Sequence, residues 1–366
     1  MRVARLAIGF GLGLLFLYLT FFVPHFGTWF DGETGIAEAF FGHARFDLSQ
    51  LGRVIASADW TPIAWAGVLF FVSLVVRAWR WQIMLEPLVR MRFGDVFSAM
   101  CIGYMANNVL PLRIGEVYRA HVVYRLSGLS RSAAFGSIIL ERVTDSFFML
   151  PFMGLAFVLY PLPGAMHRPA LLIGIAAFAA SAFLVWLAVD RSRAMRWIER
   201  VFAVLPSKAA AACTTMADRF SSGFASLGTW RRIIPIVTTS LALWAMYAGM
   251  VYCVLLSLGF MNADLPALDR NPMGATLVIL IITTLGFVIP GAPGAVGTYH
   301  GVAVLGLSLF GVPGDRAAGF AILLHALNYF PLTVLGLIYF WRLGLTFRQT
   351  REMTENVHGA SDAVPD

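Results

Sequence analysis

The sequence predicts an all-α polytopic membrane protein, built as an inverted repeat of two units that each carry a Pro/Gly-broken re-entrant helical hairpin. Of its 366 residues, 59% are hydrophobic and only 13% are charged, and the mean hydropathy is +0.75. So few charges cannot cover a water-facing surface, which excludes a soluble enzyme, a nucleic-acid-binding module and a disordered chain. Two further observations point to the repeat: apolar runs near the roughly 20 residues that span a bilayer, and Pro/Gly breaks inside two of them.

The apolar runs set out the expected helices. Six long runs are expected to cross the membrane, and the remaining sequence is expected to form the two hairpins, giving a protein that resembles one with eight spans. Treating all nine runs as spans would instead leave Arg113, Arg119 and Arg125 outside, against the preference of basic residues for the cytoplasm. The runs occupy residues 7–23, 62–84, 96–112, 133–160, 170–189, 233–258, 273–290, 296–311 and 317–341.

Loop charges set the expected orientation. Residues 24–60 are mainly acidic and are placed outside, whereas residues 190–232 are rich in arginine and are placed in the cytoplasm. The first run follows Arg2 and Arg5 without a small-residue cleavage site, so it is interpreted as an uncleaved helix. Both termini are then cytoplasmic in a multi-pass protein of the inner (cell) membrane.

Five segments follow from this arrangement. The first and third hold a transmembrane helix each, together with an external loop and a basic cytoplasmic loop respectively. That basic loop is interpreted either as amphipathic helices at the membrane surface or as a solvated hairpin. The second and fourth segments are the repeat units, and the last is a short polar tail. The segments are residues 1–59, 60–160, 161–232, 233–341 and 342–366.

The internal repeat is carried by matched helix breakers. The stretch from Leu110 to Glu116 aligns with the stretch from Ala292 to Thr298, and both place proline and glycine inside apolar sequence. With one inserted residue the match continues, so that Arg142 falls on His325 and Asp145 on Asn328. Because the first unit starts outside and the second starts inside, the two are expected to be inverted. Inverted repeats with broken helices near the midplane are a recurrent plan of transporters.

Candidate binding residues cluster around the first break. Pro111 removes a backbone donor and Gly115 permits unusual dihedral angles, so helical hydrogen bonding should lapse there and leave polar groups free for a ligand. An interfacial loop whose arginines only extend toward water is the alternative. The polar residues beside this break are Asn107, Asn108, Arg113, Glu116 and Arg119.

The helix predicted over residues 133–160 carries Glu141, Arg142 and Asp145. Ionisable groups at such depth are costly unless they are paired or face a polar cavity. The two carboxylates repel each other, so a further cation is expected beside them, with Arg113 or Arg119 as the candidate. Two interpretations remain open: a closed salt-bridge network, or an anion site in which the arginines receive a phosphate-bearing headgroup.

The second break and one arginine-rich segment complete the candidates. The stretch from residue 290 to 297 could bind an anion through backbone amides at the start of the next helix. By contrast, the stretch from Arg77 to Gln82 is interpreted as an aromatic and arginine belt at the cytoplasmic membrane surface. The candidate cavity residues of the second unit are Pro293, Gly294, Gly297, Tyr299, His300, His325 and Asn328.

These motifs resemble the flippase-like transmembrane domain of lysylphosphatidylglycerol synthases. The resemblance covers about residues 60–341 and rests on 107–116, 128–133, 141–145 and 293–298. It implies movement of a lipid or lipid-linked precursor, of phospholipid, polyprenyl-phosphate or hopanoid type, between leaflets. The family commonly has an acidic residue after the second Pro-Gly motif, where this chain has Thr298-Tyr299-His300, and its soluble aminoacyl-transfer domain has no counterpart here, so lysyl transfer is not expected.

The expected function is therefore that of a lipid flippase or transporter rather than an enzyme. A membrane-embedded lipid-modifying enzyme, or a scaffold of a cell-envelope lipid biosynthesis complex, is the alternative. Neither the three cysteines nor the seven histidines fall at metal-ligand spacing, so no metal, cofactor or disulfide is expected. The expected partners are membrane lipids with anionic headgroups and, as a second class, lipid-biosynthesis enzymes; nucleic acid is not expected.

Overall fold

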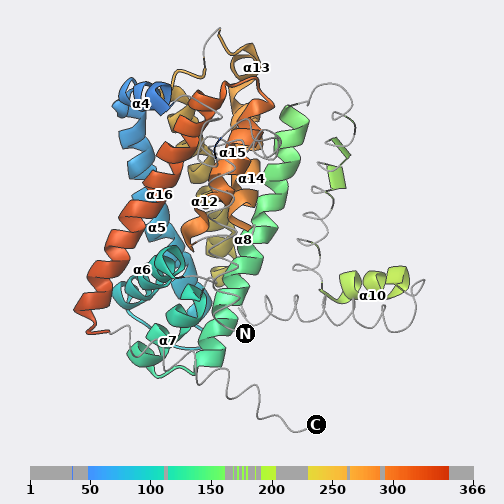
Figure 1. Ribbon diagram of the computed structural model, residues 1–366. Coiled ribbons are helices and arrows are strands. Elements are labelled where there is room, and N and C mark those ends of the chain that lie inside the picture. Colours follow the sequence, from blue (N-terminus) through green and yellow to red (C-terminus); the bar gives the residue numbers. More distant parts are fainter. Residues whose placement is uncertain are drawn as a thin grey trace.

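The protein is a bundle of α-helices in the computed structural model (Figure 1). The structure describes residues 48–110, 114–160, 191–202, 230–261, 264–288 and 293–345, together with Gly35 and isolated residues between 168 and 186. Over these residues the secondary structure is helical, which confirms the predicted all-α class. The run at residues 7–23 lies outside the described residues, and so does most of the run at 170–189.

Four helices among the described residues are long and apolar enough to cross a membrane. Their outward faces carry large apolar side chains; Trp65 on the first and Trp341 on the last are 63% and 70% exposed. Such exposure is costly in water and suits lipid, so the chain is a multi-pass membrane protein. The four are α5 (Trp60–Leu85), α8 (Arg131–Leu159), α12 (Trp230–Ser257) and α16 (Gly314–Arg342).

Two short helices lie between the long helices of each unit, so the order long, short, short, long occurs twice. In Figure 1 the first short pair lies in the lower half of the bundle and the second pair in the upper half. This placement is what an inverted repeat predicts; re-entry into a membrane stays a prediction. The first pair is α6 (Phe93–Val109) and α7 (Gly115–Ser127), and the second is α14 (Pro272–Val288) and α15 (Thr298–Ser308).

Local sequence explains where the helices begin and end. The Asp59 carboxylate accepts a hydrogen bond from the Thr61 backbone N–H at 2.8 Å and caps the start of α5. Ser130 caps α8 in the same way through the N–H of Ala133. Gly128 ends α7 with a φ of 73°, a left-handed conformation that glycine adopts without strain. The loop between α7 and α8 is therefore tight.

The two units pack through reciprocal helix contacts. The long helix α5 packs along α12, the short helix α6 packs on α16, and the short helix α14 packs on α8. Each unit thus places a short helix against the second long helix of the other. The core between them is largely apolar, with Met100, Ile102 and Phe320 buried, but it also encloses the charged side chains of Arg80 and Glu141. Because both units contribute to one core, neither can bury its apolar faces alone.

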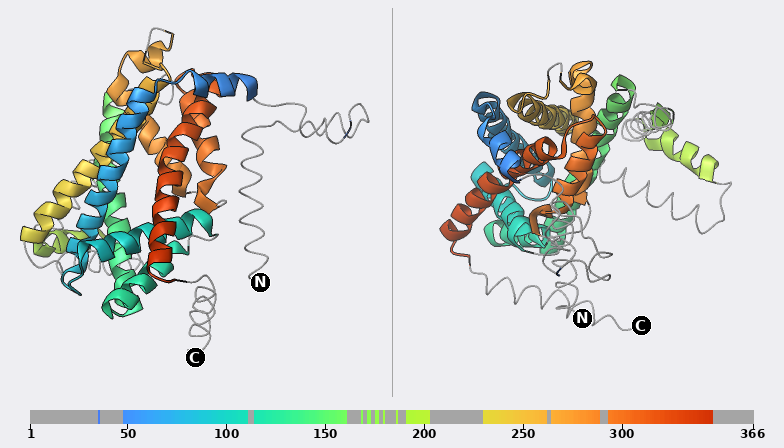
Figure 2. Two further views of the ribbon diagram at one scale, coloured as in Figure 1. Left: turned by 90° about the vertical axis from the view of Figure 1, so that its left-hand side faces the viewer. Right: turned by 45° about the horizontal axis from the view of Figure 1, so that its top comes forward.

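Three smaller α-helices of the described residues lie outside these pairs. The helix α4 (Leu48–Ala56) falls in the predicted external loop, and its Leu51 packs on Ala318 at the start of α16, as the side view of Figure 2 shows for the two helices. The helix α10 (Arg191–Phe202) falls in the basic segment where surface helices were one of two expectations. The third, α13 (Pro266–Asp269), is a single turn before α14.

Candidate functional site

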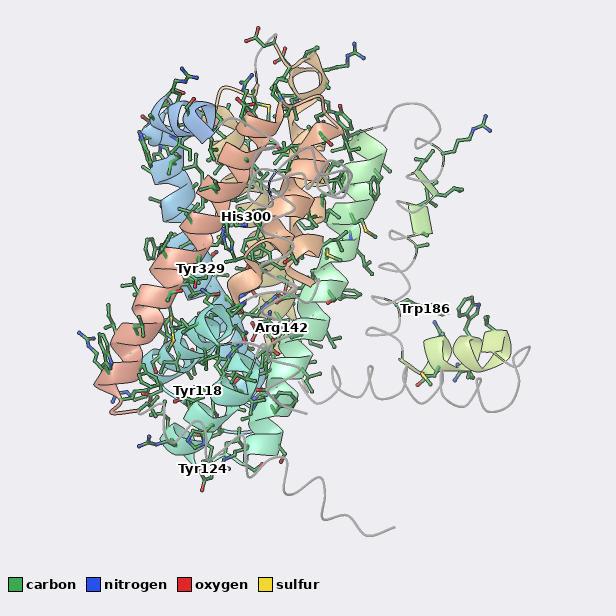
Figure 3. The ribbon with its side chains drawn as sticks, viewed as in Figure 1. Tyr118, Tyr124, Arg142, Trp186, His300 and Tyr329 are labelled. Atoms are coloured by element: carbon green, nitrogen blue, oxygen red, sulfur yellow. The ribbon has the colours of Figure 1, made fainter. Side chains whose placement is uncertain are left out.

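A buried group of charged side chains lies where four helices of the first unit meet. In Figure 3, Arg142 lies at a level between Tyr329 above and Tyr118 below, within the bundle. We call this group the charge cluster. It contains Arg77 and Arg80 from α5, Arg119 from α7, Glu141, Arg142 and Asp145 from α8, and the hydroxyl group of Tyr104 from α6.

Glu141 is the buried anchor of the charge cluster, because its side chain is 0% exposed. Its Oε2 atom lies 2.7 Å from Nη1 of Arg119, and its Oε1 atom lies 3.0 Å from Nη2 of Arg142. A carboxylate without cations would be very costly at this depth. Arg119, one of the two cations expected beside the carboxylates, therefore pairs with Glu141 and ties α7 to α8.

Asp145 lies one helical turn further along α8 and gathers the arginines of α5. Its Oδ2 atom lies 3.2 Å from Nη2 of Arg77 and 3.7 Å from Nη1 of Arg142, while its Oδ1 atom pairs with Nη2 of Arg80. Arg80 also donates a hydrogen bond of 2.8 Å to Oγ of Ser240 on α12. The charge cluster therefore reaches from the first unit to the second.

Aromatic groups hold the arginines in place. The Tyr104 hydroxyl oxygen accepts hydrogen bonds from Nη1 of Arg77 at 2.8 Å and from Nη2 of Arg142 at 2.6 Å. The guanidinium carbon of Arg119 lies 3.4 Å from the ring centroid of Trp81, a close cation–π contact. Trp81 in turn donates to Ser137 on α8. Each arginine fork thus has a defined orientation.

Positive charge exceeds negative charge in the cluster, since four guanidinium groups face two carboxylates. The arginine side chains differ in their exposed fraction: Arg142 is 36% exposed and Arg77 is 18% exposed, whereas Arg80 is 0% exposed. Several guanidinium nitrogens are buried and donate to no acceptor among the described residues, namely Nε of Arg77, Arg80, Arg119 and Arg142 and Nη2 of Arg119. Spare donors with a surplus of positive charge can bind an anion.

The other first-unit candidates lie around the α6–α7 break. The Asn107 side chain accepts a hydrogen bond from the backbone N–H of Gly115 at 2.8 Å, so it closes the hairpin. Glu116 is half-buried and makes no ion pair with another residue that the structure describes. Arg113 and Pro111 lie outside the described residues.

The ends of the two hairpins meet beside α16. The Asn108 side-chain amide donates to Oγ1 of Thr333 at 2.9 Å, and the Tyr329 hydroxyl donates to the Asn108 backbone oxygen at 3.2 Å. Gly294 packs against the Tyr329 ring so closely that a Cβ atom there would overlap it. The end of α6 and the second break are therefore neighbours.

The second-unit candidates form a packed aromatic group. A ring nitrogen of His325 lies 2.8 Å from the Gly294 backbone oxygen, and the His325 ring stacks on Tyr299 at 5.1 Å and meets His300 edge-on at 4.8 Å. Asn328 donates instead to the Leu324 carbonyl of its own helix. The 3₁₀ turn η3 (Pro293–Ala295) and Gly297, with a φ of 91°, shape the entry to α15. These residues support the break, and they lie apart from the charge cluster in the contacts described.

The sequence interpretation missed Arg77 and Arg80 as members of the site. The belt interpretation is wrong for Arg80, which is fully buried, and for Arg77, which pairs with Asp145, although Trp79 between them is 46% exposed. Two signals pointed to them: their spacing of three residues, which places both on one helix face, and the demand of Glu141 and Asp145 for more cations.

Comparisons with known proteins agree with this architecture. A family profile described as the lysylphosphatidylglycerol synthase TM region matches residues 34–336. A UPF0104 membrane protein of Methanothermobacter thermautotrophicus is 26% identical over 303 residues, which cover 80% of this chain and 86% of that protein. A similar protein of Methanocaldococcus jannaschii is 20% identical over 81% of this chain and 88% of its own length. The glycosyltransferase AglD of Haloferax volcanii is 25% identical over 77% of this chain but only 49% of its own length.

Proposed function

This chain belongs to the lysylphosphatidylglycerol synthase TM region family, and from this premise we propose that it moves an anionic lipid or lipid-linked precursor between membrane leaflets. The substrate is of phospholipid, polyprenyl-phosphate or hopanoid type. The protein acts as a transporter rather than as an enzyme, with its termini in the cytoplasm.

The charge cluster carries this proposal. Arginine stays charged at any physiological pH, and its planar fork donates two parallel hydrogen bonds to a phosphate group. Arg142 and Arg77 are the partly exposed members, so a headgroup meets them first. A group of four arginines inside a membrane bundle is too costly to keep for packing alone, since apolar side chains of similar size would serve as well.

The two carboxylates explain how the headgroup leaves again. Glu141 and Asp145 neutralise part of the arginine charge in the empty protein. An arriving phosphate has to compete with them for the same forks, so its affinity is limited and release stays fast. Transport requires binding that is strong enough for entry and weak enough for exit.

A translocation assay in liposomes tests the proposal. Purified protein is reconstituted with a fluorescent anionic phospholipid, and the fraction accessible to an impermeant quencher is followed with time. The wild-type protein is expected to speed exchange, and Arg142→Gln is expected to slow it at least about tenfold, because a charged hydrogen bond to the headgroup is lost.

The matched control is Arg232→Gln. Arg232 also pairs with a carboxylate, Glu86 at 3.0 Å, but outside the charge cluster, so this variant should keep the wild-type rate. Wild-type exchange by folded Arg142→Gln would reject the anion site and leave the salt-bridge network as a structural feature. Mass spectrometry of the lipids after the assay covers the alternative, because a chemically altered lipid would indicate an enzyme.

A further inference from the structure

We infer that the charge cluster prefers a phosphate monoester headgroup to a phosphodiester headgroup. The inference rests on the proposed function, since it names the class of headgroup that the same site takes. A monoester carries about −1.5 to −2 charges near pH 7, whereas a diester carries one. The two classes therefore differ in the amount of positive charge that they neutralise.

Charge balance is the first argument. Arg77, Arg80, Arg119 and Arg142 contribute four positive charges, and Glu141 and Asp145 contribute two negative charges. The surplus of two positive charges matches a doubly charged monoester. A diester would leave one buried guanidinium group uncompensated, and an uncompensated charge is costly in a region of low dielectric constant.

The donor set is the second argument. Tyr104 accepts hydrogen bonds from both Arg77 and Arg142, so its hydroxyl proton points away from these two groups, and no acceptor for it is found among the described residues. The partly exposed side of the cluster thus presents three donor groups: the guanidinium groups of Arg77 and Arg142 and the Tyr104 hydroxyl. A monoester has three terminal oxygens to receive them, whereas a diester has two.

Buried donors supply the third argument. Arg119 is 2% exposed, yet its Nε and Nη2 atoms donate to no acceptor in the described ranges. Its guanidinium group is held on Trp81, so it cannot turn toward water. A ligand with high negative charge density stabilises such a group, even from beyond hydrogen-bond distance, because the surroundings screen it weakly.

The test compares two lipids that differ only in the headgroup. Phosphatidic acid is a monoester and phosphatidylglycerol is a diester, and both are available with identical acyl chains. Equilibrium binding to the full-length protein in neutral detergent is expected to be at least about tenfold tighter for phosphatidic acid, the effect of one charged hydrogen bond. Equal affinity, tighter binding of phosphatidylglycerol, or no binding of either lipid would overturn the inference.

Two variants separate headgroup recognition from folding. Arg142→Gln lowers the surplus to one charge, so the preference for phosphatidic acid should shrink toward equality, while the control Arg232→Gln should keep it. Tyr104→Phe retains the ring and removes the third donor. It should therefore weaken the binding of phosphatidic acid several-fold and leave the binding of phosphatidylglycerol unchanged. A thermal unfolding curve for each variant shows that it is folded. An unchanged preference in folded Arg142→Gln and Tyr104→Phe would contradict the assignment to this cluster.

Free phosphate distinguishes a lipid site from an ion site. Inorganic phosphate should compete with phosphatidic acid only at much higher concentration, because it lacks the acyl chains; equal affinity would mean that the site takes the free ion, against the inference. Transport is measured separately. Tighter binding of phosphatidic acid without any translocation would contradict the proposed function but not this inference. Equal binding with translocation of both lipids would contradict this inference but not the proposed function.

Discussion

Asp145 is the residue on which the arginines of two helices converge, because it pairs with Arg77 and Arg80 from α5 and lies beside Arg142 on its own helix. Replacing it with asparagine keeps the size of the side chain and removes the charge. The three guanidinium groups then lose their nearer shared counter-ion and keep only Glu141, whose Oε1 atom lies 3.9 Å from Nε of Arg77 and 4.0 Å from Nη2 of Arg80. We expect Asp145→Asn to lower the free energy of unfolding by about 3 kcal/mol or more, the usual cost of breaking a buried pair.

Thermal and denaturant unfolding in detergent measure this change, and Glu86→Gln is the matched control. The Glu86 side chain is 44% exposed and pairs with Arg232, so removing its charge should lower the free energy of unfolding by less than about 1 kcal/mol. A stability of Asp145→Asn equal to that of Glu86→Gln would show that the arginines tolerate each other without Asp145.

Only part of the charge cluster could be predicted from the sequence. Glu141, Arg142 and Asp145 stand out because ionisable residues are rare in an apolar helix, and their need for a further cation, Arg113 or Arg119, follows from charge alone. The spacing of Arg80 from Arg77 and the need of the carboxylates for cations pointed to Arg80, but these signals did not decide where its side chain lies. Arg80 lies near the end of an apolar helix, where an arginine reaching the membrane surface and an arginine turned into the bundle have the same sequence pattern. Packing against α12 decides between them, and the sequence does not reveal that packing.

The α6–α7 hairpin depends on one close approach between its two helices. A Cβ atom on Gly115 would overlap the Gly103 carbonyl oxygen and lie 2.5 Å from Oδ1 of Asn107. Gly115→Ala should therefore push α7 away from α6, break the hydrogen bond from Gly115 to Asn107 and move Arg119 on the same helix. We expect a loss of about 1–3 kcal/mol in the free energy of unfolding, as for overpacked cores, together with weaker lipid binding.

Gly136→Ala is the control for this prediction, because a Cβ atom at Gly136 on α8 meets nothing within 4 Å. Alanine there should leave lipid binding unchanged and stabilise the helix by up to about 1 kcal/mol, since glycine costs conformational entropy. The two variants are compared by unfolding and by the same binding assay. If Gly115→Ala behaved like Gly136→Ala, the close approach would not be required for the hairpin or the site.

The sequence predicted the helical hairpins better than their contacts. Proline and glycine mark the breaks because they remove a donor or permit left-handed dihedral angles, and these are local properties. The contacts that join the hairpins are not local: Asn108 reaches Thr333 and Tyr329, more than two hundred residues away. The second unit shows the same limit of sequence reasoning. The sequence named His325 and Tyr299 as candidates but did not predict that their rings stack on each other.

At the scale of the whole molecule, the reciprocal helix contacts between the two units support a two-fold relation of one unit to the other. The pairing of α6 with α16 has the pairing of α14 with α8 as its counterpart, and α5 pairs with α12 between them. A two-fold axis parallel to the membrane would turn each of these contacts into the other and would place the first hairpin and the second hairpin in opposite halves, as Figure 1 shows. Such an axis also requires the loops before α8 and α16 to lie on opposite sides of the membrane.

Cysteine labelling tests that requirement directly. Ser132 lies at the start of α8 and Pro313 precedes α16, and both are exposed. In a background without Cys101, Cys213 and Cys253, we expect an impermeant maleimide to label Pro313→Cys on intact cells, and Ser132→Cys only after the cells are opened, because basic segments favour the cytoplasmic side of a membrane. Reversed labelling would keep the two-fold relation and invert the protein in the membrane, so that the charge cluster would face the outer leaflet. Labelling of both positions on intact cells would place the two loops on one side and contradict the inverted repeat.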